Sequence, residues 1–218
     1  MRSVTRFALG LSLIALGSLT VTQTAWAKKD AGTTEKKWTP IVVTNISDFD
    51  SVFSKVKTID DTIDAQTTTL NTAHTNVNTV LGVAEGSALS DGIKAAIAAA
   101  GGKLSLDTSS ATPHLKAASG ADDTVKKDAD AVNGLADAGA ATVKTVTDLV
   151  PQAEALVEAC KDFPAKIKTI VTDPAELLKA TPLLMKDMKA TSETPARIKA
   201  LSDAAVQVFT DIKAAFSA

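Results

Sequence analysis

Apolar residues recur every seven positions over two long stretches of this chain. When Ile46 is taken as position a of a heptad, the next six d positions are apolar: Phe49, Val56, Ile63, Leu70, Val77 and Ala84. A seven-residue period keeps side chains on one edge of an α-helix, so this stretch predicts a long helix over about residues 47–84. At 1.5 Å per residue that helix is roughly 57 Å long. It cannot bury its apolar stripe alone and requires helical partners.

Three a positions in the middle of this stretch are polar, namely Asp60, Thr67 and His74. Polar residues at core positions of a heptad are one way in which helices specify register and partner. We therefore take these three as candidate interaction residues. Asp60 also shares a helical face with Asp64, an arrangement that favours a solvated or inter-helix polar stripe over a calcium loop, because no glycine turn accompanies it.

The second heptad stretch begins at Val125. With Val125 at a, the later a positions are Val132, Gly139, Val146, Ala153, Cys160 and Ile167, and the apolar d positions are Leu135, Leu149, Leu156, Phe163 and Ile170. This pattern predicts a second long helix over about residues 121–172. Pro151 and Pro164 lie within it. Since the period passes both without a phase shift, kinks are favoured over full breaks.

Helix-start signals become regular near the C-terminus. Asp173 precedes Pro174 and is followed three residues later by Glu176, which together form a well-defined helix start. Thr181-Pro182 and Thr194-Pro195 repeat the cap-and-proline pattern. We therefore expect short helices over residues 174–190 and a last helix over 195–216, whose buried face consists of Ile198, Leu201, Ala205, Val208 and Ile212.

The region between the two heptad stretches, residues 85–120, predicts a connecting tip. Ser90 is a plausible N-cap of a short helix that ends at Gly101-Gly102, and residues 105–120 are expected to form a loop. The segment 81–106 is apolar and carries few charges. It is interpreted either as the packed cap of the helices, which we prefer, or as a head that contacts lipid or a partner. Its candidate interaction residues are Leu89, Ile93, Ile97 and Leu104.

These patterns predict an all-α protein, an elongated antiparallel helical bundle with coiled-coil-like heptad packing, in one domain over residues 46–218. Composition adds that Ala, Val, Ile and Leu dominate the supply of core residues and that tyrosine is absent. Small side chains favour closely packed helices. Cys160 is the only cysteine, so no intramolecular disulfide stabilises the fold.

The first 27 residues have the composition of a cleaved signal peptide. Arg2 and Arg6 precede an apolar run from Phe7 to Leu19, and Ala25-Trp26-Ala27 supplies small residues at the cleavage site. An apolar run of this length is too short for a bilayer span, which needs roughly 20 residues. Residues 28–45 are expected to form a flexible leader. Its end, with Trp38, either docks on the helices or lies free, and docking is preferred because the apolar residues 41–43 would otherwise be exposed. The prediction is an exported protein, periplasmic or extracellular.

No motif for catalysis, metal binding or cofactor binding is present. His74 and His114 are far apart in sequence and lack second ligands at helical spacing. Cys160 occupies a core heptad position, which favours a buried, inert thiol. Removal of Arg2 and Arg6 with the signal peptide changes the net charge from −2 to −4, a balance that argues against nucleic-acid binding.

The sequence therefore predicts an exported, non-enzymatic helical protein without cofactors that acts by binding a protein partner or by self-assembly. The alternative is a protein that interacts with lipid, either by lying on a membrane surface or by inserting the 81–106 segment. The faces of the predicted helices carry mixed charges, whereas surface-seeking helices usually have a lysine-rich polar face. This difference favours the protein partner.

Overall fold

The computed structural model describes residues 38–84 and 87–217, and most of them are helical, as predicted. The elements in chain order are α1 (Ser47–Leu81), α2 (Leu89–Ala99), β1 (Leu104–Asp107), β2 (His114–Ala117), α3 (Asp123–Cys160), α4 (Phe163–Ile170) and α5 (Pro174–Ala214). The predicted signal peptide, residues 1–27, and residues 28–37 of the predicted leader lie outside the described residues. Within the described ranges, no helix combines the length and apolarity needed to cross a membrane.

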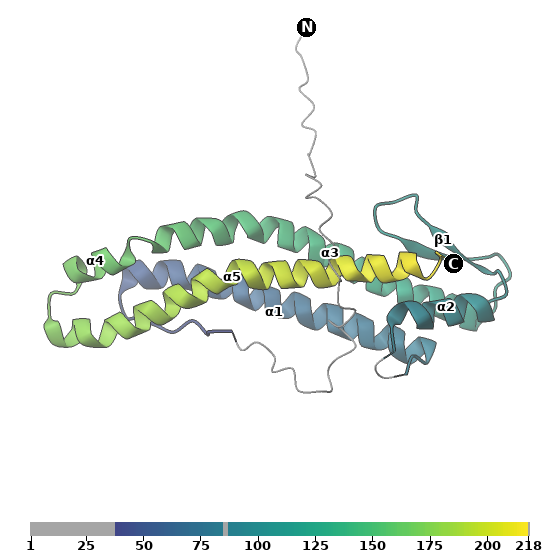
Figure 1. The fold of residues 1–218 in the computed structure, drawn as a ribbon, viewed down its shortest axis with the longest axis horizontal. Helices are drawn as coiled ribbons and strands as arrows, with labels where there is room; N and C mark the ends of the chain where they lie inside the picture. Colours follow the sequence, from purple (N-terminus) through teal and green to yellow (C-terminus); the bar gives the residue numbers. More distant parts are fainter. Residues whose placement is uncertain (1–37, 85–86, 218) are drawn as a thin grey trace, which may run out of the picture.

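The three long helices α1, α3 and α5 lie side by side along the longest axis of the molecule, with α4 at one end and α2 with the two strands at the other (Figure 1). Phe49 at the start of α1 shares a buried cluster with Cys160 at the end of α3 and with Leu184 in the first half of α5. Val77 at the other end of α1 shares the largest cluster with Val125 and Ile212. Helix α3 therefore runs antiparallel to α1 and α5.

Helix ends are set by local chemistry. Gly82 adopts a left-handed conformation with φ of 62°, which glycine tolerates and which ends α1 three residues before the predicted boundary at 84. The Asp122 side chain accepts a hydrogen bond from the Val125 backbone N–H at 3.0 Å and caps α3. The Asp173 carboxylate accepts one from the Ala175 N–H at 2.7 Å and caps α5.

The two prolines of the second heptad stretch behave differently. Helix α3 runs through Pro151, in agreement with the preference for continuity at that position. The corresponding prediction for Pro164 was wrong, because α3 ends at Cys160 and Pro164 lies in the first turn of α4. A proline in a first helical turn removes no intrahelical hydrogen bond, so starting a new helix is less costly than kinking the old one.

The predicted division near residues 191–194 is also wrong, since α5 is a single helix that includes Pro182 and Pro195. Each of these prolines follows a threonine that bonds inside the helix. The Thr181 hydroxyl donates to the Leu177 carbonyl at 2.7 Å and the Thr194 hydroxyl to the Ala190 carbonyl at 3.2 Å. The threonines therefore do not cap new helices. The predicted inner face of the last helix is buried, and it consists of Ile198, Leu201, Ala205, Val208 and Ile212.

The tip differs from the prediction in two respects. Ser90 is not an N-cap, because the cap position of α2 is Ala88 and Ser90 lies inside the helix. Residues 104–117 form an antiparallel hairpin rather than a loop, with Leu106 paired to Leu115. Leu104 and Leu115 are buried in the largest core cluster. Their burial gives the hairpin a hydrophobic face against the helices, which a two-stranded sheet requires for stability.

The outer edge of β2 is held by one side chain of α3. The Asn133 carboxamide oxygen accepts from the Leu115 backbone N–H at 2.6 Å, and its Nδ2 donates to the Leu115 carbonyl at 2.9 Å. An amide side chain can thereby replace the two backbone groups of a neighbouring strand. The hairpin is thus fixed to α3 by hydrogen bonds as well as by apolar packing.

Candidate functional site

A buried arginine lies between α1 and α5 near the middle of the long axis. The side chain of Arg197, in α5, is only 10% exposed. Its Nη1 lies 2.6 Å from Oδ1 of Asp60, which is also buried, and its Nη2 donates to Oδ1 of the exposed Asp64 at 2.7 Å. Asp60 and Asp64 are one turn apart on α1. One planar guanidinium therefore connects an interior carboxylate to a surface carboxylate.

Burial dominates the electrostatics of this ion pair. The pKa of Asp60 is raised, first because burial disfavours its charged form, although the Arg197 charge opposes this and the neighbouring Asp64 and Asp61 add to it. Arg197 supplies the counter-charge of the buried Asp60. Asp60 is thus one predicted interaction residue that occupies an inter-helix polar contact.

An extended segment, residues 38–45, lies along α5 and is called the strap below. The Thr39 backbone N–H donates to Oε2 of Glu193 at 3.1 Å, and the Val42 N–H donates to Oδ1 of Asp187 at 2.7 Å. Because the strap residue number rises as the α5 number falls, the strap runs antiparallel to α5. The expected docking of this segment is thus made by two carboxylates of α5, in addition to apolar packing by Ile41.

The two ends of the strap are fixed by side chains. The ring of Trp38 lies over the Arg197 guanidinium, with 5.7 Å from the ring centroid to Cζ. At the other end, the Thr44 backbone N–H and hydroxyl both donate to Oδ1 of Asp50, at 2.8 and 2.7 Å. Asn45 then adopts a positive φ of 62° and turns the chain into α1. The strap therefore connects the buried ion pair to the start of the first helix.

Asp187 is a buried acid whose pKa is raised well above its ordinary value. Its side chain is fully buried, and burial raises its pKa to about 6, with the Val42 N–H opposing the shift and the charge of Asp50 adding to it. Its Oδ2 has no hydrogen-bond partner among the described residues. The carboxyl group therefore holds the strap at an electrostatic cost.

Cys160 lies close to Asp187 and Thr191, and is buried. Burial is the main reason that its pKa is raised, and the Thr191 hydroxyl only partly opposes the effect. A thiol with a raised pKa and no access to solvent is a poor nucleophile. This location agrees with the expected buried thiol at a core heptad position.

An apolar groove of about 580 Å³ runs between α1 and α3. It is lined by Val52, Lys55, Thr58, Ile59 and Thr62 of α1 and by Leu149, Gln152, Ala155, Leu156 and Ala159 of α3. Ile59 and Leu149 form its buried floor, whereas Ala155 and Ala159 are exposed on its α3 wall. Lys55 is the only charged residue in the lining. Pro151 lies in the same stretch of α3, where it removes one backbone hydrogen bond of the helix.

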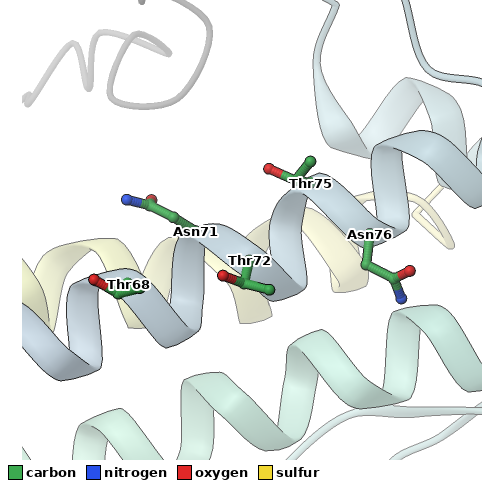
Figure 2. Close-up of a pocket in the computed structure, with 5 residues that line it drawn as sticks. All are labelled: Thr68, Asn71, Thr72, Thr75 and Asn76. Carbon is green, nitrogen blue, oxygen red and sulfur yellow. The ribbon is translucent and has the colours of Figure 1, made fainter.

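A second hollow, of about 450 Å³, is formed by one face of α1 alone. Figure 2 shows its five lining side chains projecting from consecutive turns of that helix: Thr68, Asn71, Thr72, Thr75 and Asn76. All five are hydroxyl or carboxamide groups, which do not titrate near neutral pH. The Thr68 hydroxyl already donates to the Asp64 carbonyl at 2.9 Å. This surface offers hydrogen bonding without acid–base chemistry.

The other polar heptad candidates do not join the Asp60 contact. Thr67 is exposed, and its hydroxyl donates to the Ile63 carbonyl of its own helix at 2.8 Å. His74 is half-buried, its pKa is lowered by burial, and its Nδ1 lies 3.3 Å from Nδ2 of Asn78. The structure therefore places Asp60, Thr67 and His74 in three separate environments along α1.

The candidate residues of the tip point into the protein. Leu89, Ile93 and Leu104 are buried in the largest core cluster, and Ile97 packs against it. A partner or a lipid reaches these side chains only if the tip opens. Across the described ranges, no group of three or more His, Cys, Asp and Glu side chains is placed to hold a metal ion.

Sequence reasoning did not identify Arg197, Asp187 or the groove. A signal for Arg197 existed, because after Arg6 it is the only arginine and every other basic residue except the histidines is a lysine. Arginine is preferred over lysine where one cation must contact two carboxylates in a buried place. Asp187 and the groove depend on which helices are neighbours, and the periodicity of a single helix does not specify that.

Comparison of the chain with models of protein families, with curated proteins and with solved structures found no match. The geometry described above is therefore the basis for the functional proposal.

Proposed function

We propose that this protein is an exported, non-enzymatic helical protein that binds a helical segment of a partner protein in the groove between α1 and α3. Export follows from the signal-peptide composition of residues 1–27 and would deliver the protein to the periplasm or the cell exterior. The proposal includes the finer architecture expected from the heptads, an elongated antiparallel bundle with coiled-coil-like packing. The groove is the single observation on which the proposed activity depends.

The dimensions of the groove favour a helix as its occupant. The α1 wall extends from Val52 to Thr62 and the α3 wall from Leu149 to Ala159, each about three helical turns. An amphipathic helix of that length presents apolar side chains at positions i, i+3, i+4 and i+7 to such a groove. The small side chains of Ala155 and Ala159 allow the partner backbone to approach closely.

The single charged residue of the groove indicates which charge the partner helix should carry. Lys55 is the only charged lining residue, and the remaining polar lining groups are Thr58, Thr62 and Gln152. A partner helix with an acidic residue beside its apolar stripe would pair with Lys55, which fixes orientation more than it adds affinity. The buried carboxyl groups Asp60 and Asp187 are engaged in contacts within the fold, which supports binding rather than catalysis.

The alternative expected from the sequence places lipid contact at residues 81–106. Burial of Leu89, Ile93 and Leu104 favours the groove over the tip, because the groove is open in the folded protein. Contact through the tip requires the loss of apolar packing at the end of the molecule, which costs free energy before any binding begins.

Photo-cross-linking within the groove tests this proposal. A photoreactive residue at Ala155, introduced in the cells that make the protein, should form an adduct with one partner protein, and mass spectrometry should map the adduct to an amphipathic helix of that partner. Ala159→Glu should abolish the adduct, because a buried charge would enter the apolar interface. The matched control is a photoreactive residue at Ala141, which is exposed on α3 outside the groove and should give no adduct.

Two outcomes would contradict the proposal. If Ala155 gives no adduct beyond that of Ala141, the groove does not bind a partner. If the adduct joins two copies of this chain, the groove serves self-assembly, and the partner-protein proposal fails.

A further inference from the structure

Three of the seven large apolar side chains that are exposed among the described residues lie toward the end of the molecule where α4 and α5 meet: Ile170, Leu178 and Met185. Leu178 is 78% exposed and Met185 is 52% exposed, and both lie in the first half of α5. They are seven residues apart, about two helical turns, so they share one face. The exposed Pro182 lies between them on that face. We call Leu178, Pro182 and Met185 the outer stripe. Isolated exposed apolar residues are common in proteins, but an aligned row is not.

The outer stripe lies on a different face of α5 from the residues that pack in the core. The side of α5 that faces the other helices carries the buried residues Ala180, Leu184 and Asp187. At 3.6 residues per turn, these lie on the opposite side of the helix from Leu178 and Met185. The first half of α5 therefore buries Ala180 and Leu184 on its inner side, against α1, α3 and α4, and exposes further apolar side chains on its outer side.

Lysines accompany the outer stripe, and acids do not. Lys179, Lys186 and Lys189 are exposed on the same half of the helix. Between Glu176 and Glu193 the only acid is Asp187, which is fully buried and points inward. Lys166 and Lys168 of the adjacent α4 are also exposed, as is the apolar Ile170 at its end. Exposed acids at this end, Asp162, Asp173 and Glu176, lie before the outer stripe. The α5 face between Glu176 and Glu193 thus presents apolar groups and cations, although the whole chain is slightly acidic.

From this geometry we infer that the outer face of the first half of α5 binds an anionic membrane surface. A helix that lies in the interface of a bilayer places its apolar side chains among the upper acyl chains and its lysines at the phosphates. The Leu178 and Met185 side chains provide the apolar contact, and Lys179, Lys186 and Lys189 provide the charge complementarity. The predicted lipid contact through residues 81–106 is at the other end of the molecule, so the surface inferred here is a different one (Figure 1).

Membrane binding through α5 leaves the proposed partner groove accessible. The groove is lined only by residues of α1 and α3, and none of its lining residues belongs to α5. The inference is therefore independent of the proposed partner binding, and either can fail alone.

Vesicle flotation tests the inference. The protein is used without residues 1–27, because the apolar run Phe7–Leu19 would itself enter lipid, and this form retains every described residue. It should float with vesicles of phosphatidylglycerol and phosphatidylcholine and bind pure phosphatidylcholine at least about tenfold more weakly. High salt should reduce the binding to anionic vesicles.

Substitutions then assign the binding to the stripe. Leu178→Ser with Met185→Ser should lower the affinity for anionic vesicles by about tenfold or more, as expected for the loss of two buried apolar side chains. The matched control is Val80→Ser with Val206→Ser, two exposed apolar residues away from this end, which should bind as the unsubstituted protein does. All four side chains are exposed, so both variants should remain folded, which circular dichroism checks.

Three results would overturn the inference. In the first, the protein fails to bind anionic vesicles, and in the second, the control variant loses as much affinity as the stripe variant. In the third, the unsubstituted protein binds no vesicles and forms a dimer, whereas the stripe variant is a monomer. The last result would assign the stripe to a second copy of the chain.

Discussion

At the scale of single residues, the ion pair at Arg197 shows why this position requires arginine. Its two Nη atoms contact two carboxylates that differ in exposure, and the aromatic ring of Trp38 lies over its plane. A lysine has one ammonium group and cannot make both contacts with the same geometry. The buried Asp60 therefore depends on Arg197 for compensation of its charge.

Replacement of Arg197 by methionine should destabilise the protein strongly. The substitution keeps an unbranched side chain but leaves Asp60 buried without its counter-charge, which costs about 3–5 kcal/mol of the free energy of unfolding. Denaturation with urea measures this loss. The double variant Asp60→Leu with Arg197→Met should recover much of the stability, because it removes both charges together. Equal stability of Arg197→Met and the unsubstituted protein would show that the ion pair contributes nothing.

Asp187 should make stability depend on pH in the opposite direction from an ordinary salt-bridged acid. Its folded-state pKa of about 6 is above the ordinary aspartate value of 3.8, so the folded state retains the proton more readily than the unfolded state. The contribution of protonated Asp187 to the free energy of unfolding is therefore fully present below about pH 4 and is lost as the pH rises through about 6. The full difference is on the order of 3 kcal/mol.

The variant Asp187→Asn isolates this effect, since its carboxamide oxygen can still accept the Val42 N–H but does not titrate. The free energy of unfolding of the unsubstituted protein, minus that of the variant, should fall between about pH 4 and pH 7. Asp130→Asn, an exposed position on α3, controls for the loss of one carboxylate. A difference that stays constant over this range would contradict the raised pKa.

At the scale of elements, the stability of the β1–β2 hairpin depends on the side chain of Asn133, because the two strands are short. Each strand has four residues, and such a short hairpin is only marginally stable alone. The Asn133 side chain satisfies both backbone groups of Leu115, which lies in the partly buried edge of β2. Without this side chain, two backbone groups lose their partners at once.

Asn133→Ala should therefore loosen the hairpin while leaving the long helices intact. Each lost hydrogen bond is worth about 1 kcal/mol, so amide hydrogen exchange at residues 104–117 should accelerate by roughly tenfold or more. Asn133→Asp retains the acceptor for the Leu115 N–H but places a carboxylate oxygen against the Leu115 carbonyl, so it should accelerate exchange as well. Unchanged exchange in Asn133→Ala would show that apolar packing alone holds the hairpin.

The hairpin also shows how far individual elements could be predicted from the sequence. Leu104, Leu106 and Leu115 alternate with polar residues, which is a signal for strands. The surrounding Ser, Thr, Pro and Gly residues favoured a loop instead, and the deciding partner, Asn133, is distant in sequence. Pro164, Pro182 and Pro195 were likewise ambiguous, because a proline in a helical pattern either starts a helix or is tolerated inside it, depending on tertiary packing.

At the scale of the whole molecule, the predominantly helical character could be predicted from the two heptad stretches, because burial of an apolar stripe requires long helices. The buried face of the last helix followed from the same periodicity. The sites could not be predicted in the same way. The groove, the Asp60–Arg197 pair and the strap contacts each join elements that are far apart in the chain, and the pattern within one helix does not say which helix lies beside it.

The strap has a mechanical consequence. The chain enters the described body at Trp38, beside Arg197 and thus near the middle of its length, and only then runs to the start of α1. A pull on any tether attached ahead of Trp38 would act sideways on the body. It would peel the strap from α5 one bond at a time, first at Thr39–Glu193 and then at Val42–Asp187, before the load reached the helices. Because these bonds would break one after another, the strap should detach while the helices stay folded.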